Sequence, residues 1–228
     1  MTSNNFSIIF VNKSNNAGSA TIYQNDPSLG VSGAHSLAWF SKFANPDTSA
    51  FFDWTVDYSF TWADTGVLAP GVIYRSAQTL PADLTTSNQT TLTFNGGFQF
   101  INQGAGPIAG SLQVLQDNTI PPRQGAVGIG LGERPVYAVQ AQPNISLTFN
   151  PKPQYFLTFG NFLEGEVLDL ASITNAVALD FPSRTFSLTV TLNPDNTFTV
   201  KPTSEANAQL LAAREDDPEA QFGTRLAA

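Results

Sequence analysis

The residues that could carry catalysis are few in this chain. It has one histidine, His35, and no cysteine, so a nucleophile activated by imidazole would have to use His35. No Gly-x-Ser-x-Gly motif accompanies it, and none of the four lysines follows a serine by three positions, as a Ser-x-x-Lys enzyme requires. The sequence therefore predicts no catalytic triad, and we expect His35 to be an ordinary loop or strand-edge residue.

Paired carboxylates are the other catalytic option. Asp53 and Asp57 are four positions apart on one predicted strand face, which separates them by roughly 13 Å, beyond the ~5–9.5 Å that glycoside hydrolysis uses. Glu164 and Glu166 flank Gly165, and in an extended segment they would be about 7 Å apart, an allowed spacing. An exposed turn is the ordinary explanation of such a pair. A hydrolase using Glu164 and Glu166 is the third of our functional hypotheses.

Metal and phosphate chemistry have little support. One histidine without cysteine cannot form a zinc site unless three carboxylates join it. Calcium stays open, because the Asp-Asn loops at 117–118 and 195–196 offer oxygen ligands. The glycines between 128 and 132 resemble a phosphate loop, but Pro135 and a strand-like segment follow where a helix should begin. We expect no cofactor, with calcium as the open alternative.

The aromatic content is high, with 18 Phe, 5 Tyr and 3 Trp, and it suits a carbohydrate-binding module in which exposed rings stack on sugars. Trp54 and Trp62 lie on a predicted core face. Candidate ligand-binding rings must lie elsewhere, and we select Trp39, Phe40 and Tyr155.

Charge and composition limit the partners. The formal net charge is −8 and the basic residues are scattered, so nucleic acid and anionic membranes would be repelled. The N-terminal residues lack the basic and apolar regions of a signal peptide, and no run of 18 apolar residues occurs. We expect a cytoplasmic protein.

Strand signals fill the chain. In residues 51–62 apolar and polar side chains alternate, broken only by Phe51, as in one long strand with one buried face. Turn residues should close hairpins at 95–97 and 193–196. Shorter β-branched and aromatic runs occupy residues 6–11, 20–24, 36–40, 72–76, 90–94, 98–102, 111–115, 136–140, 146–149, 155–159, 185–192 and 197–201.

This pattern predicts an all-β protein, an antiparallel two-sheet β-sandwich, with a closed barrel as the alternative. The composition changes only near residue 202. We expect one sandwich domain over residues 1–202 and an acidic, alanine-rich tail over 203–228.

The sequence of the tail predicts a short helix over about residues 204–214, followed by a flexible end. Leu210 and Leu211 lie on its thin apolar stripe. A helix of eleven residues is marginal alone, and Pro218 prevents its continuation. We therefore expect Leu210 and Leu211 to contribute to association between subunits.

Several segments together resemble the RhiA family, the rhizosphere-expressed proteins of root-associated bacteria. They span about residues 6 to 201: FSIIFVNKSNNAG at 6–18, SLAWFSKFA at 36–44, WTVDYSF at 54–60, IPP at 120–122 and QAQPN at 140–144. The resemblance implies an abundant bacterial cytosolic protein, produced under cell-density control and without an established enzymatic activity. It transfers no catalytic residue.

The sequence thus favours a non-enzymatic protein that acts by binding or by self-association into a homo-oligomer. The alternative is a carbohydrate- or small-molecule-binding module.

Overall fold

The fold is taken from a computed structural model, which describes the backbone of residues 5–215 and the side chains of residues 5–209. Within this range seventeen strands precede a single helix, α1 (Thr203–Glu215). The prediction of an all-β chain with a short C-terminal helix is confirmed.

The strands form four sheets. Sheet A has the order β17 (Phe198–Pro202), β16 (Ser187–Leu192), β1 (Asn5–Asn12), β5 (Ser49–Thr55), and sheet B the order β15 (Ala176–Ala178), β14 (Tyr155–Gly160), β2 (Gly18–Gln24), β4 (Phe40–Ala44). Sheet C has the order β3 (His35–Ser36), β12 (Arg134–Gln140), β11 (Ala126–Leu131), β6 (Tyr58–Ala63), β7 (Gln78–Ala82). Sheet D has the order β13 (Ser146–Phe149), β10 (Leu112–Gln116), β8 (Gln89–Phe94), β9 (Phe98–Gly104).

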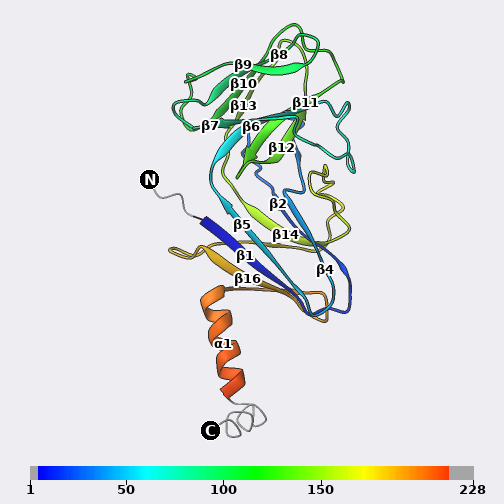
Figure 1. The fold of residues 1–228 in the computed structure, drawn as a ribbon, viewed down its shortest axis with the longest axis vertical. Coiled ribbons are helices and arrows are strands. Elements are labelled where there is room, and N and C mark those ends of the chain that lie inside the picture. The colour runs from blue at the N-terminus through cyan, green and yellow to red at the C-terminus, as the bar shows by residue number, and fades with distance from the viewer. Residues whose placement is uncertain (1–4, 216–228) are drawn as a thin grey trace.

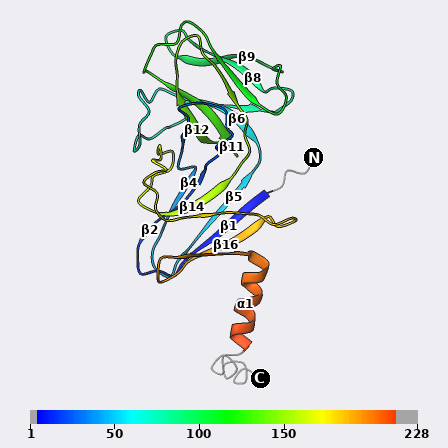
Figure 2. The ribbon, with the colours of Figure 1, turned by 180° about the vertical axis from the view of Figure 1, so that it is seen from behind.

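The four sheets pack as two sandwiches arranged end to end (Figure 1 and, from behind, Figure 2). Sheet A faces sheet B, as the 5.6 Å between the ring centroids of Phe10 and Phe159 shows. Sheet C faces sheet D, where the rings of Trp62 and Phe98 are also 5.6 Å apart. No sheet formed by residues 5–215 closes on itself. The expectation of a single antiparallel two-sheet sandwich is therefore wrong, because the chain divides its strands between two sandwiches. Two of the described strand pairs, β1 with β16 and β8 with β10, are also parallel.

The predicted strand over residues 51–62 is two strands. β5 belongs to sheet A and β6 to sheet C, and between them Val56 is 37 % exposed. The Thr55 hydroxyl donates to the Asp57 carboxylate at 2.5 Å, and such a local bond competes with strand pairing. Alternation could not reveal the break, because Trp54 and Phe60 keep the same parity and are both buried, at 4 % and 0 % exposed.

A second segment also crosses between the sandwiches. The predicted strand over 36–40 divides into β3, in sheet C, and the start of β4, in sheet B. Trp39 lies between these strands, 1 % exposed, and its indole N–H donates to the carbonyl of Leu131 in β11 at 3.0 Å. This hydrogen bond links the segment between β3 and β4 to sheet C.

The tight turns are as predicted, whereas four strand assignments need correction. Residues 95–97 join β8 to β9, and residues 193–196 join β16 to β17. Residues 72–76 form only an isolated bridge at Ile73. The sequence also missed β7, β15 and β11, the last because its glycines resemble a loop.

The glycines of β11 are required by close backbone contacts. A Cβ atom on Gly128 would lie 1.9 Å from the Tyr137 carbonyl oxygen, and one on Gly130 would lie 2.5 Å from the Ser59 hydroxyl. Separations below 3.0 Å are essentially never tolerated by a real Cβ atom. β11 is consequently a central strand whose neighbours approach more closely than a side chain would allow.

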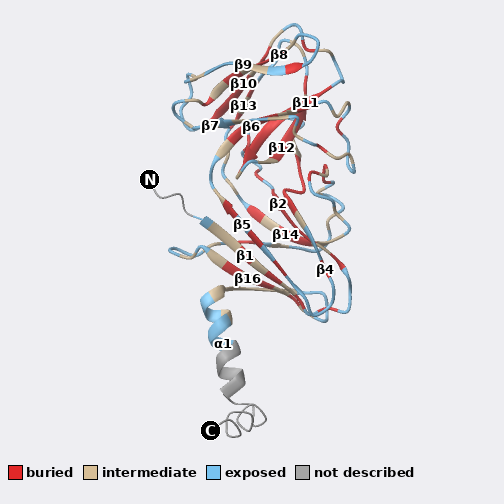
Figure 3. Cartoon of the chain, viewed as in Figure 1, coloured by how far each residue is buried: buried red, intermediate tan, exposed pale blue. Residues whose placement is uncertain are grey.

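Helix α1 matches the predicted 204–214 within one residue at each end. Its first residue is anchored, because the Thr203 hydroxyl hydrogen-bonds those of Ser187 and Thr189 at 2.9 and 3.2 Å. Beyond it the helix extends away from sheet A, with mostly exposed residues in its described part (Figure 3). The side chains of Leu210 and Leu211, and the whole of Pro218, lie outside the described residues. α1 is too short and too polar to cross a membrane, and it is the one helix among the described residues.

Replacing Gly128 by alanine should destabilise the chain by about 3 kcal/mol or more, because the new methyl group meets backbone that cannot move away without distorting the sheet. Gly97→Ala is the matched control. A Cβ atom on Gly97 meets nothing within 4 Å, so its free energy of unfolding should change by no more than about 0.5 kcal/mol. Urea unfolding of the two variants makes the comparison, and equal losses would contradict the close packing of β11.

The five tyrosines should resist ionisation in the folded chain. Burial raises the pKa of Tyr23, Tyr58, Tyr74, Tyr137 and Tyr155, that of Tyr58 to about 12. An unfolded tyrosine titrates near pH 10. A pKa raised by folding contributes stability that is complete below about pH 10 and is lost as the pH rises toward the folded value. Phenolate absorbance of the native chain should stay flat through about pH 10 and should rise together with unfolding. The urea-unfolded chain is the control, and a native titration identical to it would contradict the burial.

Candidate functional site

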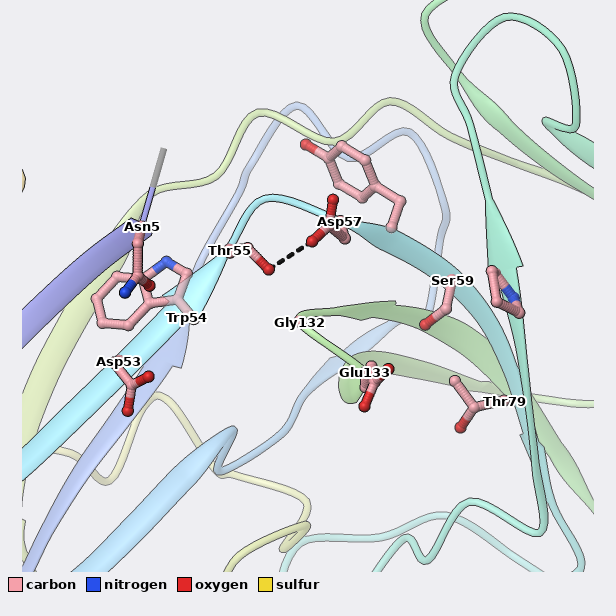
Figure 4. Close-up of a pocket in the computed structure, with 11 residues that line it drawn as sticks. Asn5, Asp53, Trp54, Thr55, Asp57, Ser59, Thr79, Gly132 and Glu133 are labelled. Carbon is pink, nitrogen blue, oxygen red and sulfur yellow. Dashed lines mark hydrogen bonds between the residues drawn. The ribbon is translucent and has the colours of Figure 1, made fainter. Parts of the chain in front are cut away.

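A pocket of about 620 Å³ lies where the chain passes from the first sandwich to the second, and we call it the junction pocket. Its size falls in the range of small-molecule sites. Figure 4 shows its lining side chains around the turn that joins β11 to β12. The lining residues are Asn5, Asp53, Trp54, Thr55, Asp57, Tyr58, Ser59, Thr79, Pro81, Gly132 and Glu133.

The wall of the junction pocket is formed by the β5–β6 break and by the tight turn at Gly132 and Glu133. Both turn residues have positive φ, 55° and 64°, as a two-residue type I′ hairpin requires. The Gly132 N–H donates to the Asp57 carbonyl at 2.9 Å. This bond holds the turn against the break, so the pocket is built by backbone contacts between the two sandwiches.

Three carboxylates line the junction pocket, from Asp53, Asp57 and Glu133, and none of its described lining residues is a lysine, arginine or histidine. The sequence-based separation of Asp53 and Asp57 assumed one straight strand. Because the strand breaks between them, both residues instead line the same pocket. The arrangement gives a concave wall of negative charge.

Ser59 is a buried polar group of this wall that lacks a hydrogen bond. The residue is 3 % exposed, and its hydroxyl has no hydrogen-bond partner among the described residues. In Figure 4 the hydroxyl points toward the Gly132–Glu133 turn. A buried hydroxyl without a partner is disfavoured by about 1–3 kcal/mol. Its oxygen has less than 1 Å² of accessible surface and lies against Gly130 of β11, so the hydroxyl is buried within the wall and is not open to the pocket.

Sequence reasoning did not find Ser59, Thr79 or Glu133. Two of them lie on or beside strands that the sequence missed, Thr79 on β7 and Glu133 after β11. The glycine run before Glu133 was the available signal, since glycines inside a strand mark close backbone approach.

The predicted ligand-binding rings lie together but in the core. Trp39, Phe40 and Tyr155 are 1 %, 5 % and 9 % exposed. The Trp39 ring centroid lies 4.5 Å from that of Phe40 and 5.8 Å from that of Tyr155. These rings present no open face on which a sugar could stack.

The candidate carboxylate pair at 164 and 166 is occupied by other contacts. Glu164 forms an ion pair with Arg134. The carboxylate of Glu166 accepts the N–H of Leu163 at 2.9 Å, and Gly165 between them has a φ of +81°. The segment is a turn that its own hydrogen bonds stabilise.

His35 lines a second pocket, of about 420 Å³, with Asp26 and Asp169 among its neighbours. Asp26 is already bonded, because it accepts the N–H and the hydroxyl of Ser28 at 2.8 and 2.7 Å and the N–H of Lys152 at 2.8 Å. Ser36 and Tyr137 also line this pocket.

The two loops considered for calcium are self-bonded turns. Asp195 accepts the hydroxyl and the N–H of Thr197 at 2.7 and 3.1 Å, which lowers the pKa of its carboxyl group. Asp117 bonds Thr119 in the same manner. Within the described part of the chain no three histidine, aspartate or glutamate side chains are grouped so that they could hold a metal ion.

Comparison with known proteins agrees with the resemblance found in the sequence. The family model for RhiA matches residues 3–203. Protein RhiA of Rhizobium leguminosarum bv. viciae is 32 % identical over 200 residues, covering 86 % of each chain. No solved structure matches this chain. The match takes in all the strands and ends where α1 begins, and on this extent and identity the chain belongs to the RhiA family.

Proposed function

We propose that this RhiA-family chain binds a small molecule in the junction pocket and performs no chemistry on it. The observation that carries the proposal is the pocket itself, a hollow of about 620 Å³ whose lining includes three carboxylates and the polar side chains of Asn5 and Thr79. Concave sites with a few convergent polar groups are where proteins bind ligands.

The same geometry supports binding over catalysis. The junction pocket offers carboxylates but no imidazole or thiol to act on a substrate. Glu164 and Glu166, the candidates for hydrolysis, are held by Arg134 and by the Leu163 N–H. Substrate turnover that disappears when both glutamates are replaced by glutamine would favour the hydrolase hypothesis instead.

The setting of this function is also a proposal. We propose that the protein acts in the cytoplasm of a root-associated bacterium, as an abundant accessory factor produced under cell-density control. Membership of the RhiA family supports the source. The chain has no cysteine and so cannot form the disulfide bonds that are common in proteins of oxidising compartments, which supports the proposal of a cytoplasmic location.

Filling the junction pocket should abolish ligand binding while the fold is kept. Thr79 is an exposed lining residue on β7, and Thr79→Trp places a large ring in the pocket at a position where a strand accepts aromatics. Ligand-observed NMR with mixtures of sugars, amino acids and amines should detect binding to the native chain and at least tenfold less to this variant, a difference of about 1.4 kcal/mol.

Gln99→Trp is the matched control, because Gln99 is exposed on β9, outside the junction pocket. It should bind as the native chain does. If no compound binds in a manner that Thr79→Trp prevents, the proposed function is wrong.

Self-association is the second candidate, and α1 favours it. Beyond Thr203 the helix leaves sheet A, and its main contacts are with β16 and β17 (Figure 1). A thirteen-residue helix is marginal unless its side is packed. A second copy of the chain could supply that packing, and we propose a homo-oligomer in which α1 docks on its neighbour.

Deleting residues 205–228 should lower the oligomer mass and leave the domain folded. The deletion keeps Thr203, whose hydroxyl bonds β16, so the melting transition should stay within a few degrees of that of the full chain, as expected for a loss of about 1 kcal/mol or less. Light scattering after size exclusion gives the mass. A truncated chain with the mass of the full-length assembly would rule out α1 as the contact.

A further inference from the structure

A groove of about 460 Å³ lies between α1 and the outer face of sheet A, and we call it the helix groove. Outward-facing side chains of β1, β16 and β17 form its floor, and two residues of α1 form one side. We propose that residues 216–228, the acidic end of the same chain, dock in the helix groove. The proposal does not depend on the junction pocket. It differs from the proposed homo-oligomer because the occupant belongs to the same chain.

The floor of the helix groove is a partly exposed surface. Side chains alternate across sheet A, so that Phe10 and Val190 are fully buried toward sheet B. Val11 and Thr191 face the other way, are partly exposed, and line the groove. Together with Ala206 of α1 they provide methyl groups on which an apolar side chain can pack.

The charge of the helix groove is opposite to that of the protein. The charged side chains among its described lining residues are Lys13 and Lys201, and none of these lining residues is acidic. They are two of the four lysines in a chain with a net charge of −8. Lys201 donates to the neutral side-chain amide of Gln209 at 2.7 Å and forms no ion pair with a described residue. Lys13 pairs with the exposed Asp47 at 2.9 Å. A positively charged hollow attracts an acidic occupant.

The two lysines lie on different strands and at different levels of sheet A. Lys201 on β17 pairs with Thr189 on β16. Lys13 lies two residues beyond Val11 of β1, which pairs with Thr191. The lysines are thus separated by two strand spacings, roughly 10 Å, and by about four residues along the strands, roughly 13 Å. An extended segment with several separated carboxylates reaches both lysines more readily than a small anion does.

The sequence of residues 216–228 matches this surface. It begins with three acidic residues, Asp216, Asp217 and Glu219. In an extended chain the first and last of them are about 10 Å apart, so they can pair with lysines on different strands. Phe222 follows and is the only aromatic residue after residue 203. Its ring can cover the methyl groups of the floor while the carboxylates meet the lysines.

The length of the segment allows it to reach the helix groove of its own chain. From Gln209, which lines the groove, to the end of α1 at Glu215 is six residues, or about 9 Å of helix. Pro218 cannot continue a helix, and the residues from 219 to 228 can span up to about 33 Å. A segment tethered so closely has an effective concentration in the millimolar range. A second copy of the chain would have to reach a comparable concentration to compete.

The experiment is disulfide trapping in the full-length chain, which has no cysteine of its own. Thr191→Cys places one thiol on the floor of the helix groove, and Ala220→Cys places the other between the acidic residues and Phe222. Under mild oxidation at micromolar protein, the disulfide should form within one chain, as mobility on a non-reducing gel and the mass of the product show. Salt at about 1 M should slow this closure, because it screens surface ion pairs.

Replacing the lysines of the helix groove tests the role of charge. Lys13→Gln/Lys201→Gln should slow closure about fivefold, which is the loss of about 1 kcal/mol expected for two surface ion pairs. Lys152→Gln/Arg123→Gln is the matched control, because it removes the same charge from exposed residues outside the helix groove. Its closure rate should stay within about twofold of that of the parent chain. A thermal melt verifies that each variant is folded.

Replacing the acidic residues tests the same contact from the other side. Asp216→Asn/Asp217→Asn/Glu219→Gln should slow closure by a similar factor. Combining it with the lysine substitutions should slow closure little further, because both sets remove the same ion pairs. These three substitutions leave both sandwiches unchanged, so they test the proposal even if the lysine variant fails to fold.

Three results would overturn the proposal. Equal slowing in the lysine variant and its control would mean that the charge of the whole protein, and not the helix groove, attracts the segment. Closure that none of the substitutions slows would mean that the two thiols meet by random encounter. Disulfides that form mainly between two chains would assign the occupant of the groove to a second copy.

Discussion

The packing of Trp39 against Trp54 is the contact on which the rest of this structure depends. Trp39 lies between β3 and β4, and Trp54 lies near the end of β5, just before the chain passes to β6. Their ring centroids are 5.2 Å apart in an edge-to-face arrangement. The indole N–H of Trp39 also donates to the Leu131 carbonyl at 3.0 Å. A buried aromatic pair contributes about 0.5–1.5 kcal/mol beyond its area, and here it packs together two segments where the chain passes between the sandwiches.

The junction pocket follows from this contact. With Trp54 fixed in the core, the chain must turn outward at Val56, which is 37 % exposed, before β6 enters sheet C. The Gly132 N–H then reaches the Asp57 carbonyl at 2.9 Å. The hollow lies between this break and the β11–β12 turn. The junction pocket is thus formed where the two sandwiches meet and not by any one sheet.

The local features could be predicted from the sequence, but the place where the chain passes from one sandwich to the other could not. Alternation found the buried face of β5 correctly, and the turn residues located both hairpins, because each depends on a few neighbouring residues. In β6 the expectation of one wet face is wrong, because Ser59 and Thr61 are 3 % and 0 % exposed. The division into four sheets depends on where a strand changes partner, and parity is unchanged across the break at Val56. The candidate rings Trp39, Phe40 and Tyr155 were selected as exposed, but their burial comes from contacts between sheets that no single segment encodes. The pocket residues Ser59 and Glu133 were missed for the same reason.

Three departures from local consistency meet at the junction pocket. Glu133 has a φ of 64°, a region that glycine and asparagine occupy more readily than glutamate. Ser59 leaves a buried hydroxyl without a partner in the described structure, and the chain is interrupted between β5 and β6 although its sequence alternates from residue 52 to residue 62. Each departure is unfavourable for folding, and a sequence selected only for stability would remove them singly, for example with asparagine at 133 or alanine at 59. Their concentration in one wall, beside three carboxylates, is what the proposed binding role would explain, because natural sequences break local rules chiefly where function requires it.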